Sequence, residues 1–85
     1  MATVTLYTKD YCPYCNKAKS LFKRKGIEQF TEIDITHDEK LQKEMIDKSG
    51  GRKTVPQIFI DGKHVGGCDD LYALEAAGKL NALLG

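Results

Sequence analysis

Two cysteines near the start of the chain, Cys12 and Cys15, are the residues whose spacing most directly suggests chemistry. Side chains three positions apart are neighbours on a helix, so the two sulfurs can reach the separation that a disulfide requires. Pro13 follows the first cysteine and suits the first turn of a helix, where its missing N–H is not needed. The segment therefore predicts a redox-active dithiol at a helix start.

The two thiols should differ in role, Cys12 acting as the nucleophile and Cys15 as the resolving thiol. Cys12 stands at the exposed helix start, whereas Cys15 lies on the apolar stripe that should face inward. A thiol attacks as its thiolate, and a cysteine with an ordinary pKa of about 8.5 is only slightly ionised at neutral pH. The helix N-terminus and the N–H groups of Tyr14 and Cys15 should lower the pKa of Cys12. The positive charge of Lys9, three residues upstream, should add to this effect.

A zinc site is the main alternative interpretation of the cysteine pair, and it needs two further ligands. Cys68, His37 and His64 are the only other cysteine or histidine side chains. They form no second pair at the usual spacing, and Pro13 inside the motif favours a helix start over a zinc knuckle. We therefore expect no metal site, and we interpret both histidines as surface residues.

The elements that position the cysteines follow from alternation, helical periodicity and turn residues. Strands are predicted over residues 3–7, 30–35, 57–60 and 63–66. Helices are predicted over residues 13–25, from a start at 36–39 to about 49, from the 66–70 loop to a stop at 78, and over 79–84. Strand, helix, strand predicts parallel pairing of the first two strands, whereas Asp61 and Gly62 signal a hairpin that makes the second half antiparallel.

Two details of this assignment concern helix starts and helix faces. Thr36 and Glu39 should form a capping box that satisfies the free N–H groups at the start of the second helix. The apolar residues expected to face inward from the last three helices are Leu41, Met45, Ile46, Leu71, Leu74, Ala77, Leu80, Leu83 and Leu84.

Length and composition exclude several classes of protein. With 85 residues the chain is expected to form one domain, residues 1–85, around a single core. No apolar run approaches the roughly 20 residues that a membrane span needs, so we expect no membrane association. An odd number of cysteines argues against a disulfide-stapled secreted module, and the N-terminus lacks the pattern of a secretory signal. A reducing, cytoplasmic location is therefore expected.

Five basic residues between positions 17 and 25 raise the question of nucleic-acid binding. They lie on one amphipathic helix without a known binding motif, so no nucleic-acid partner is expected. A solvated basic face that steers anionic thiol partners is the better interpretation.

Three segments together resemble the signature segments of a known family. They are Cys-Pro-Tyr-Cys at 12–15, Thr-Val-Pro at 54–56 and Gly-Gly-Cys-Asp-Asp at 66–70. In this order and spacing they resemble those of the dithiol glutaredoxins, most closely the small bacterial members, and the resemblance covers essentially the whole chain. It implies an α/β thioredoxin fold with a four-stranded mixed sheet flanked by helices.

The same resemblance implies a glutathione-dependent thiol-disulfide oxidoreductase that reduces glutathione mixed disulfides and protein disulfides. Glutathione is then a co-substrate, and no permanently bound cofactor is expected. Expected partners are glutathione and glutathionylated or disulfide-containing proteins, with ribonucleotide reductase among the candidates. The protein is expected to act as a monomer.

Glutathione is a tripeptide with two carboxylates and one ammonium, and the resemblance suggests how the chain would hold it. A cis Pro56 would expose the backbone of Val55 to pair with the glutathione cysteine as a short strand does, although a proline at a strand start is the plainer alternative. Gly67 would let the backbone approach the ligand, and the following helix start offers N–H groups to a carboxylate. Asp69 and Asp70 would cap that helix, bind the ammonium, or do both.

The remaining groups are cationic, aromatic or sulfur-containing. Lys9 and Arg52 are the cations expected for the other carboxylate, with solvated surface side chains as the alternative. Tyr14 should stand exposed beside the sulfurs, while Cys68 is expected to be a packed residue rather than a regulatory thiol. The full set of candidate glutathione-binding residues is Lys9, Tyr14, Arg52, Thr54, Val55, Pro56, Gly67, Cys68, Asp69 and Asp70.

Other functions stay open at this stage. One is a redoxin reduced by a flavoprotein reductase that serves ribonucleotide reductase, and the glutathione-type segment at 66–70 disfavours it. Another is an iron–sulfur cluster carrier that holds a cluster between two monomers through Cys12 and glutathione, which Pro13 and the second cysteine disfavour. A binding module without catalysis is the third, and it would not need a reactive thiol.

Overall fold

Four strands form one mixed sheet in the order β2-β1-β3-β4 in the computed structural model, which describes residues 2–85. The central strand β1 (Val4–Thr8) pairs in parallel with β2 (Thr31–Asp34). On its other side β1 pairs antiparallel with β3 (Gln57–Ile60), which pairs antiparallel with β4 (Lys63–Gly66). The predicted four-stranded mixed sheet is confirmed.

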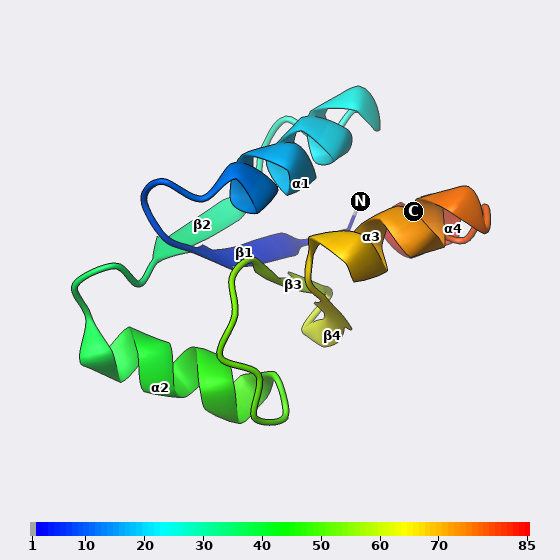
Figure 1. Cartoon of the computed structure of the whole chain (residues 1–85). Coiled ribbons are helices and arrows are strands. Elements are labelled where there is room, and N and C mark those ends of the chain that lie inside the picture. Colours follow the sequence, from blue (N-terminus) through cyan, green and yellow to red (C-terminus); the bar gives the residue numbers. More distant parts are fainter. Residues whose placement is uncertain (1) are drawn as a thin grey trace.

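Helices cover both faces of this sheet. Figure 1 shows α1 (Pro13–Arg24) and α3 (Cys68–Ala76) on one face and α2 (Glu39–Lys48) on the other. The short α4 (Leu80–Leu84) follows α3 on the same side. Because α1 begins five residues after β1 ends, the first cysteine lies just beyond the carboxyl end of the central strand.

The core has two parts because side chains alternate across the sheet. Val4 and Leu6 of β1 belong to a large cluster with α1, α3 and α4. Tyr7 points to the opposite face, where it packs with Met45 of α2 and with Phe59, whose ring lies edge-on to it at 5.7 Å. The helices on each face are therefore held to the sheet by their own cluster of buried apolar contacts.

The start of α2 differs from the prediction. Asp38 is the N-cap residue, and its carboxylate accepts the N–H of Leu41 at 3.0 Å, so the expected capping box of Thr36 and Glu39 is wrong. Aspartate is as good an N-cap residue as threonine, and it stands directly before the helix. The Thr36 hydroxyl instead accepts the N–H of Asp10 at 2.9 Å, which ties the loop after β2 to the loop before α1.

Two residues expected to face inward are exposed. Ala77 lies just past the end of α3, and Leu83 on α4 is 38% exposed because Leu80 and Leu84 occupy the inward side of that short helix. The hairpin prediction is confirmed, since Asp61 and Gly62 both have positive φ, as a tight two-residue turn requires. Within residues 2–85, no helix has the length and apolar character needed to cross a membrane.

Candidate active site

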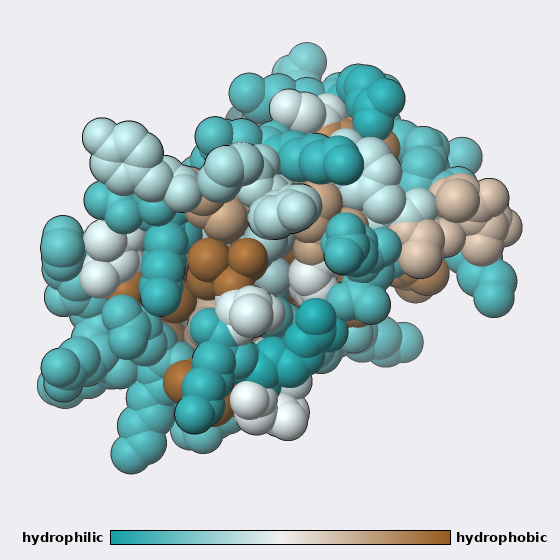
Figure 2. All heavy atoms as spheres, viewed as in Figure 1, coloured by the Kyte–Doolittle hydropathy of each residue, from teal (hydrophilic) through white to brown (hydrophobic). Residues whose placement is uncertain are grey.

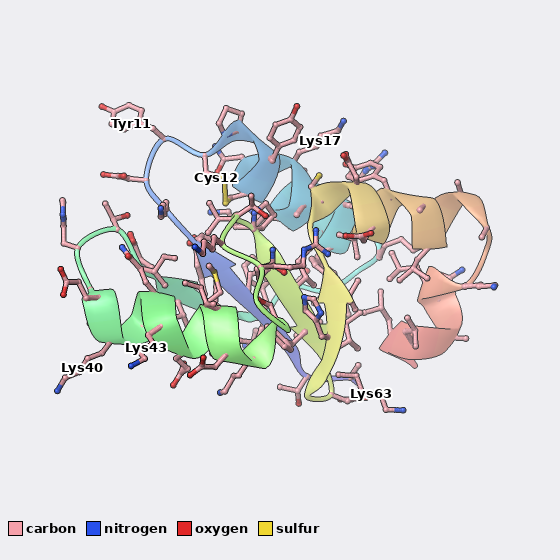
Figure 3. All side chains as sticks on the ribbon, turned by 60° about the horizontal axis from the view of Figure 1, so that its bottom comes forward. Tyr11, Cys12, Lys17, Lys40, Lys43 and Lys63 are labelled. Carbon is pink, nitrogen blue, oxygen red and sulfur yellow. A yellow bond between two sulfur atoms is a disulfide. The ribbon has the colours of Figure 1, made fainter. Side chains whose placement is uncertain are left out.

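The cysteine pair occupies the start of α1. Cys12 is the N-cap residue, and its sulfur accepts the N–H of Cys15 at 3.1 Å. The two residues are joined by a disulfide, with their Cα atoms 5.2 Å apart. Cys15 is 1% exposed, whereas Cys12 is partly exposed. Figure 3 shows Cys12 at the start of the helix. The expected asymmetry between an accessible and a buried sulfur is therefore present.

The segment before β3 lies against the first cysteine. The sulfur of Cys12 is 4.0 Å from the carbonyl oxygen of Val55, and the peptide bond between Val55 and Pro56 is cis. Thr54 is exposed and Val55 half-buried, so backbone groups of this segment border the accessible sulfur. A substrate bonded to Cys12 would therefore meet the main chain of this segment.

A groove of about 320 Å³ runs from this segment to the start of α3. Figure 2 shows an apolar area near the middle of a mostly hydrophilic face, between α1 and α2. The residues that line the groove are Tyr14, Arg52, Thr54, Val55, Pro56, Gly67, Cys68, Asp69 and Asp70. All nine belong to the candidate set from the sequence, and Lys9 is the one candidate that the fold does not bring to the lining.

One wall of the groove is built on the start of α3. The Asp70 carboxylate accepts the N–H of Gly67 at 2.9 Å and forms an ion pair with Arg52 at 3.0 Å. The Gly67 bond first, and the Arg52 bond second, hold the pKa of Asp70 below its ordinary value. Asp70 therefore joins the helix start to a cation that arrives from a distant part of the chain.

Glycine is required where this wall is tightest. Gly66 has φ +122°, and a Cβ there would collide with the Asp70 carboxylate. A Cβ on Gly67 would lie 3.4 Å from the Pro56 carbonyl oxygen and 3.5 Å from the Arg52 guanidinium. The distances at Gly67 are ordinary van der Waals contacts, so the requirement for glycine applies to Gly66, where the positive φ and the Asp70 carboxylate leave no room for a side chain.

Arg52 is fixed by the end of α2. The buried Ser49 hydroxyl donates to the Arg52 carbonyl at 3.0 Å and accepts the Arg52 N–H at 3.2 Å. These two bonds hold the backbone of Arg52 in place just past the helix end. The guanidinium can therefore reach Asp70 across 18 positions of sequence.

Sequence reasoning missed a hydrogen-bonded support behind the segment 54–56. The carboxamide of Gln57 is fully buried, and its nitrogen donates to the Thr54 carbonyl at 2.9 Å. This bond turns the carboxamide oxygen of Gln57 toward His64. That oxygen lies 2.7 Å from His64 Nε2, so this nitrogen must carry the proton. A carboxamide inside an otherwise apolar strand was the available signal, because a buried amide needs partners.

Cys68 belongs to the wall and to the core at once. It is buried within the large apolar cluster, and burial raises the pKa of its thiol. The packed position agrees with the interpretation from the sequence. Within residues 2–85, no three histidine, cysteine, aspartate or glutamate side chains gather as a metal site would require.

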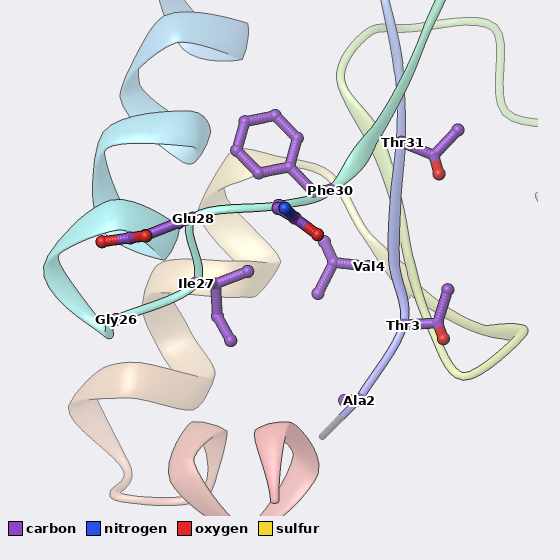
Figure 4. A pocket seen from close by; sticks show the side chains of 9 residues that line it. Ala2, Thr3, Val4, Gly26, Ile27, Glu28, Phe30 and Thr31 are labelled. Carbon is purple, nitrogen blue, oxygen red and sulfur yellow. The ribbon is translucent and has the colours of Figure 1, made fainter.

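A larger hollow, of about 600 Å³, lies at the other end of the sheet (Figure 4). It is bordered by the start of β1 and by the segment 26–31 after α1. Glu28 is the one charged side chain among the described residues that line it. This hollow therefore gathers no set of reactive groups, in contrast to the smaller groove beside Cys12.

The Asp70 contacts predict how stability depends on pH. A carboxylate whose pKa is lowered on folding contributes stability above its unfolded pKa of about 3.9, and this is lost as the pH falls through the lower folded pKa. The difference in free energy of unfolding between the wild type and Asp70→Asn should thus be largest near neutral pH and shrink below about pH 4. Urea denaturation at a series of pH values between about 2.5 and 7 measures this difference in free energy of unfolding.

Asp69→Asn is the matched control for this prediction. It removes the same charge from the same helix turn, yet leaves the bonds to Gly67 and Arg52 intact. Its difference from the wild type should change less with pH than that of Asp70→Asn. Parallel curves for the two variants would contradict the assignment of the effect to these bonds.

Known proteins that resemble this chain in sequence and in structure belong to one family. The family model described as Glutaredoxin matches residues 4–65. Glutaredoxin 3 of Escherichia coli is 56% identical over 84 residues, which are 99% of each chain.

Solved structures show the same likeness. The solution structure of glutaredoxin from Brucella melitensis is 56% identical with a TM-score of 0.84, and the match covers 99% of this chain and 89% of that one. A buckwheat glutaredoxin–glutathione complex is 32% identical with a TM-score of 0.86, over 98% of this chain and 76% of that one. The likeness to glutaredoxins, in sequence and in fold, thus extends over nearly the full length of this chain.

Proposed function

Because the chain belongs to the glutaredoxin family and is a thiol-disulfide oxidoreductase, we propose that glutathione is the thiol that reduces it. The observation that carries the proposal is the groove, which begins beside the accessible sulfur and ends at the start of α3. A tripeptide thiol needs a reactive sulfur at one end and partners for its carboxylates farther away. The buckwheat relative was solved as a complex with glutathione, which supports the proposal.

Each part of glutathione has a chemical counterpart along the groove. Its cysteine would pair with the backbone of Val55, next to Cys12. One carboxylate would accept N–H groups at the start of α3, a helix of nine residues, where the dipole favours negative charge. The other carboxylate would pair with Arg52, and the ammonium with Asp69 or Asp70.

The exposed ring of Tyr14 completes one side of the groove. It is 59% exposed and would cover the apolar part of the bound tripeptide. Lys9 lies on the loop before α1 and outside the lining. We therefore assign Lys9 to long-range attraction of anionic substrates rather than to direct contact.

Reduction of a glutathionylated protein then proceeds in two exchanges. The Cys12 thiolate attacks the glutathionyl sulfur, a Cys12–glutathione disulfide forms, and the substrate sulfur leaves as a thiolate that takes up a proton. A second glutathione thiolate attacks the glutathionyl sulfur on Cys12. Oxidised glutathione, made of the substrate's own glutathionyl group and the one free glutathione consumed, is released and the Cys12 thiolate returns. The substrate disulfide is thus exchanged for the disulfide of oxidised glutathione.

Reduction of a protein disulfide uses both cysteines. Cys12 attacks one substrate sulfur and forms a mixed disulfide, and the Cys15 thiolate then attacks the Cys12 sulfur. The reduced substrate leaves, and the Cys12–Cys15 disulfide that remains is the bond seen in the structure. Two glutathiones reduce this bond and leave as oxidised glutathione.

The proposal is tested by comparing reductants for the wild type. We expect rapid, saturable reduction of a glutathionylated peptide by glutathione, and much slower turnover when free cysteine replaces glutathione at equal thiolate concentration. Thioredoxin reductase with NADPH forms a third arm. Equal rates with glutathione and cysteine, or faster turnover with the reductase, would reject glutathione as the reductant and leave the oxidoreductase assignment in place.

Four further expectations from the sequence stay predictions. They are the organisation as a single domain, the cytoplasmic location, the monomeric state, and ribonucleotide reductase as one protein substrate. Gel filtration of the reduced protein tests the monomeric state directly.

A further inference from the structure

Tyr11 is an unusual residue for its position. Its side chain is 100% exposed, so it packs against nothing in the fold. Its φ is +51°, in the left-handed region that bulky side chains rarely adopt and that glycine or asparagine adopts easily. The side chain therefore contributes no burial, and the backbone conformation favours a different residue type.

The loop that carries Tyr11 is fixed on both sides. Before it, the Asp10 N–H donates to the Thr36 hydroxyl at 2.9 Å. After it, Cys12 caps α1, and its carbonyl accepts the N–H of Asn16 at 3.1 Å. Tyr11 is thus held between two anchored residues, and Figure 3 shows its ring projecting away from the helices.

Exposed large apolar side chains are concentrated at this place. In the part of the chain that the structure describes, they are Tyr11, Tyr14 and Leu83, and the two tyrosines stand on either side of Cys12. Tyr14 lines the groove, whereas Tyr11 does not. A substrate small enough to fit the groove therefore leaves Tyr11 uncovered.

We propose that Tyr11 is a docking contact for protein substrates, on which a polypeptide segment beside the substrate disulfide packs an apolar side chain as Cys12 attacks. Tyrosine is among the residues most enriched in protein interfaces, and it contributes most to binding where a partner buries its ring. Conflict between a residue type and its local backbone is expected where function rather than folding selects the residue. The inference rests on the oxidoreductase activity and on Cys12 as the attacking sulfur, and it does not depend on glutathione.

The test compares a protein disulfide with a small one in single-turnover reactions of the prereduced protein. Insulin is the protein disulfide and 2-hydroxyethyl disulfide the small one, with acid quenching and thiol alkylation as the readout. In Tyr11→Asn and Tyr11→Gly, the rate constant with insulin should fall about 5- to 10-fold, while that with the small disulfide stays within about 2-fold. Tyr11→Phe keeps the ring and should behave as the wild type does.

Stability separates docking from a structural role. Tyr11→Asn and Tyr11→Gly relieve the strain of the positive φ and lose no packing. Their urea midpoints should therefore equal or exceed that of the wild type. Equal losses with both substrates, or no loss with insulin, would overturn the proposal. Lower urea midpoints in Tyr11→Asn and Tyr11→Gly would also overturn the proposal, in favour of a role in loop structure. So would a lower rate constant with insulin in Tyr11→Gly that Tyr11→Asn does not share. Because glutathione is absent from these reactions, their outcome is independent of the reductant assay.

Discussion

Replacing Cys12 with serine should abolish the reduction of both glutathione mixed disulfides and protein disulfides, by at least about 10³-fold. A hydroxyl does not ionise near neutral pH, and it forms no disulfide, so both exchange pathways lose their first step. The structure supports a selective effect. Cys12 is the N-cap residue of α1, and serine is a preferred residue at that position.

The measurement uses the two substrates side by side. Steady-state turnover of a glutathionylated peptide and of insulin gives the two activities, and urea denaturation of Cys12→Ser against the reduced wild type gives the stability. We expect stabilities that agree within about 1 kcal/mol. Residual activity above a tenth of the wild type with either substrate would show that another sulfur carries out the attack.

Replacing Cys15 with serine should separate the two activities. Reduction of the glutathionylated peptide should stay near the wild-type rate, because that pathway uses Cys12 alone. Reduction of insulin should fall by roughly 10²-fold or more. In the wild type the resolving thiol is held close to Cys12, with the two Cα atoms 5.2 Å apart, whereas in the variant a thiol from solution must take its place. The ratio of the two rates is the decisive quantity, since a general loss of folded protein would lower both.

Burial complicates this variant and requires a matched partner. Cys15 is 1% exposed, and a buried hydroxyl without a partner costs about 1–3 kcal/mol. Cys15→Ala removes the sulfur without adding a polar group, so it should show the same ratio of rates with a smaller loss of stability. Loss of both activities in both variants would contradict the division of roles between the two cysteines.

The sequence predicted the parts of the fold that depend on local signals. Gly26, with φ +84°, is the expected stop after α1, and Asp61 with Gly62 forms the expected hairpin turn. Predictions failed where two local signals competed, as when Asp38 rather than Thr36 caps α2. They failed again at Leu83, because α4 is one turn long and its inward side is narrow.

The candidate site divides in the same way. Residues in contiguous motifs, such as Val55 and Gly67, could be named from the sequence and do line the groove. The contact between Gln57 and His64 could not, because it depends on the pairing of β3 with β4, which is irregular between Ile58 and Phe59. The pattern and the turn predict that these two strands pair, but the irregularity in register decides which side chains meet, and that could not be read from the sequence.

The ion pair between Arg52 and Asp70 has a consequence for how long a product stays bound. A carboxylate that arrives at Arg52 meets a guanidinium already engaged by Asp70, so it shares or replaces a partner instead of gaining a free cation. Both side chains are also close to half-exposed, and solvent screening weakens any new pair. If glutathione binds there as proposed, the groove should therefore retain it weakly. For an enzyme that exchanges disulfides between molecules, rapid departure of the oxidised ligand allows the next turnover to begin.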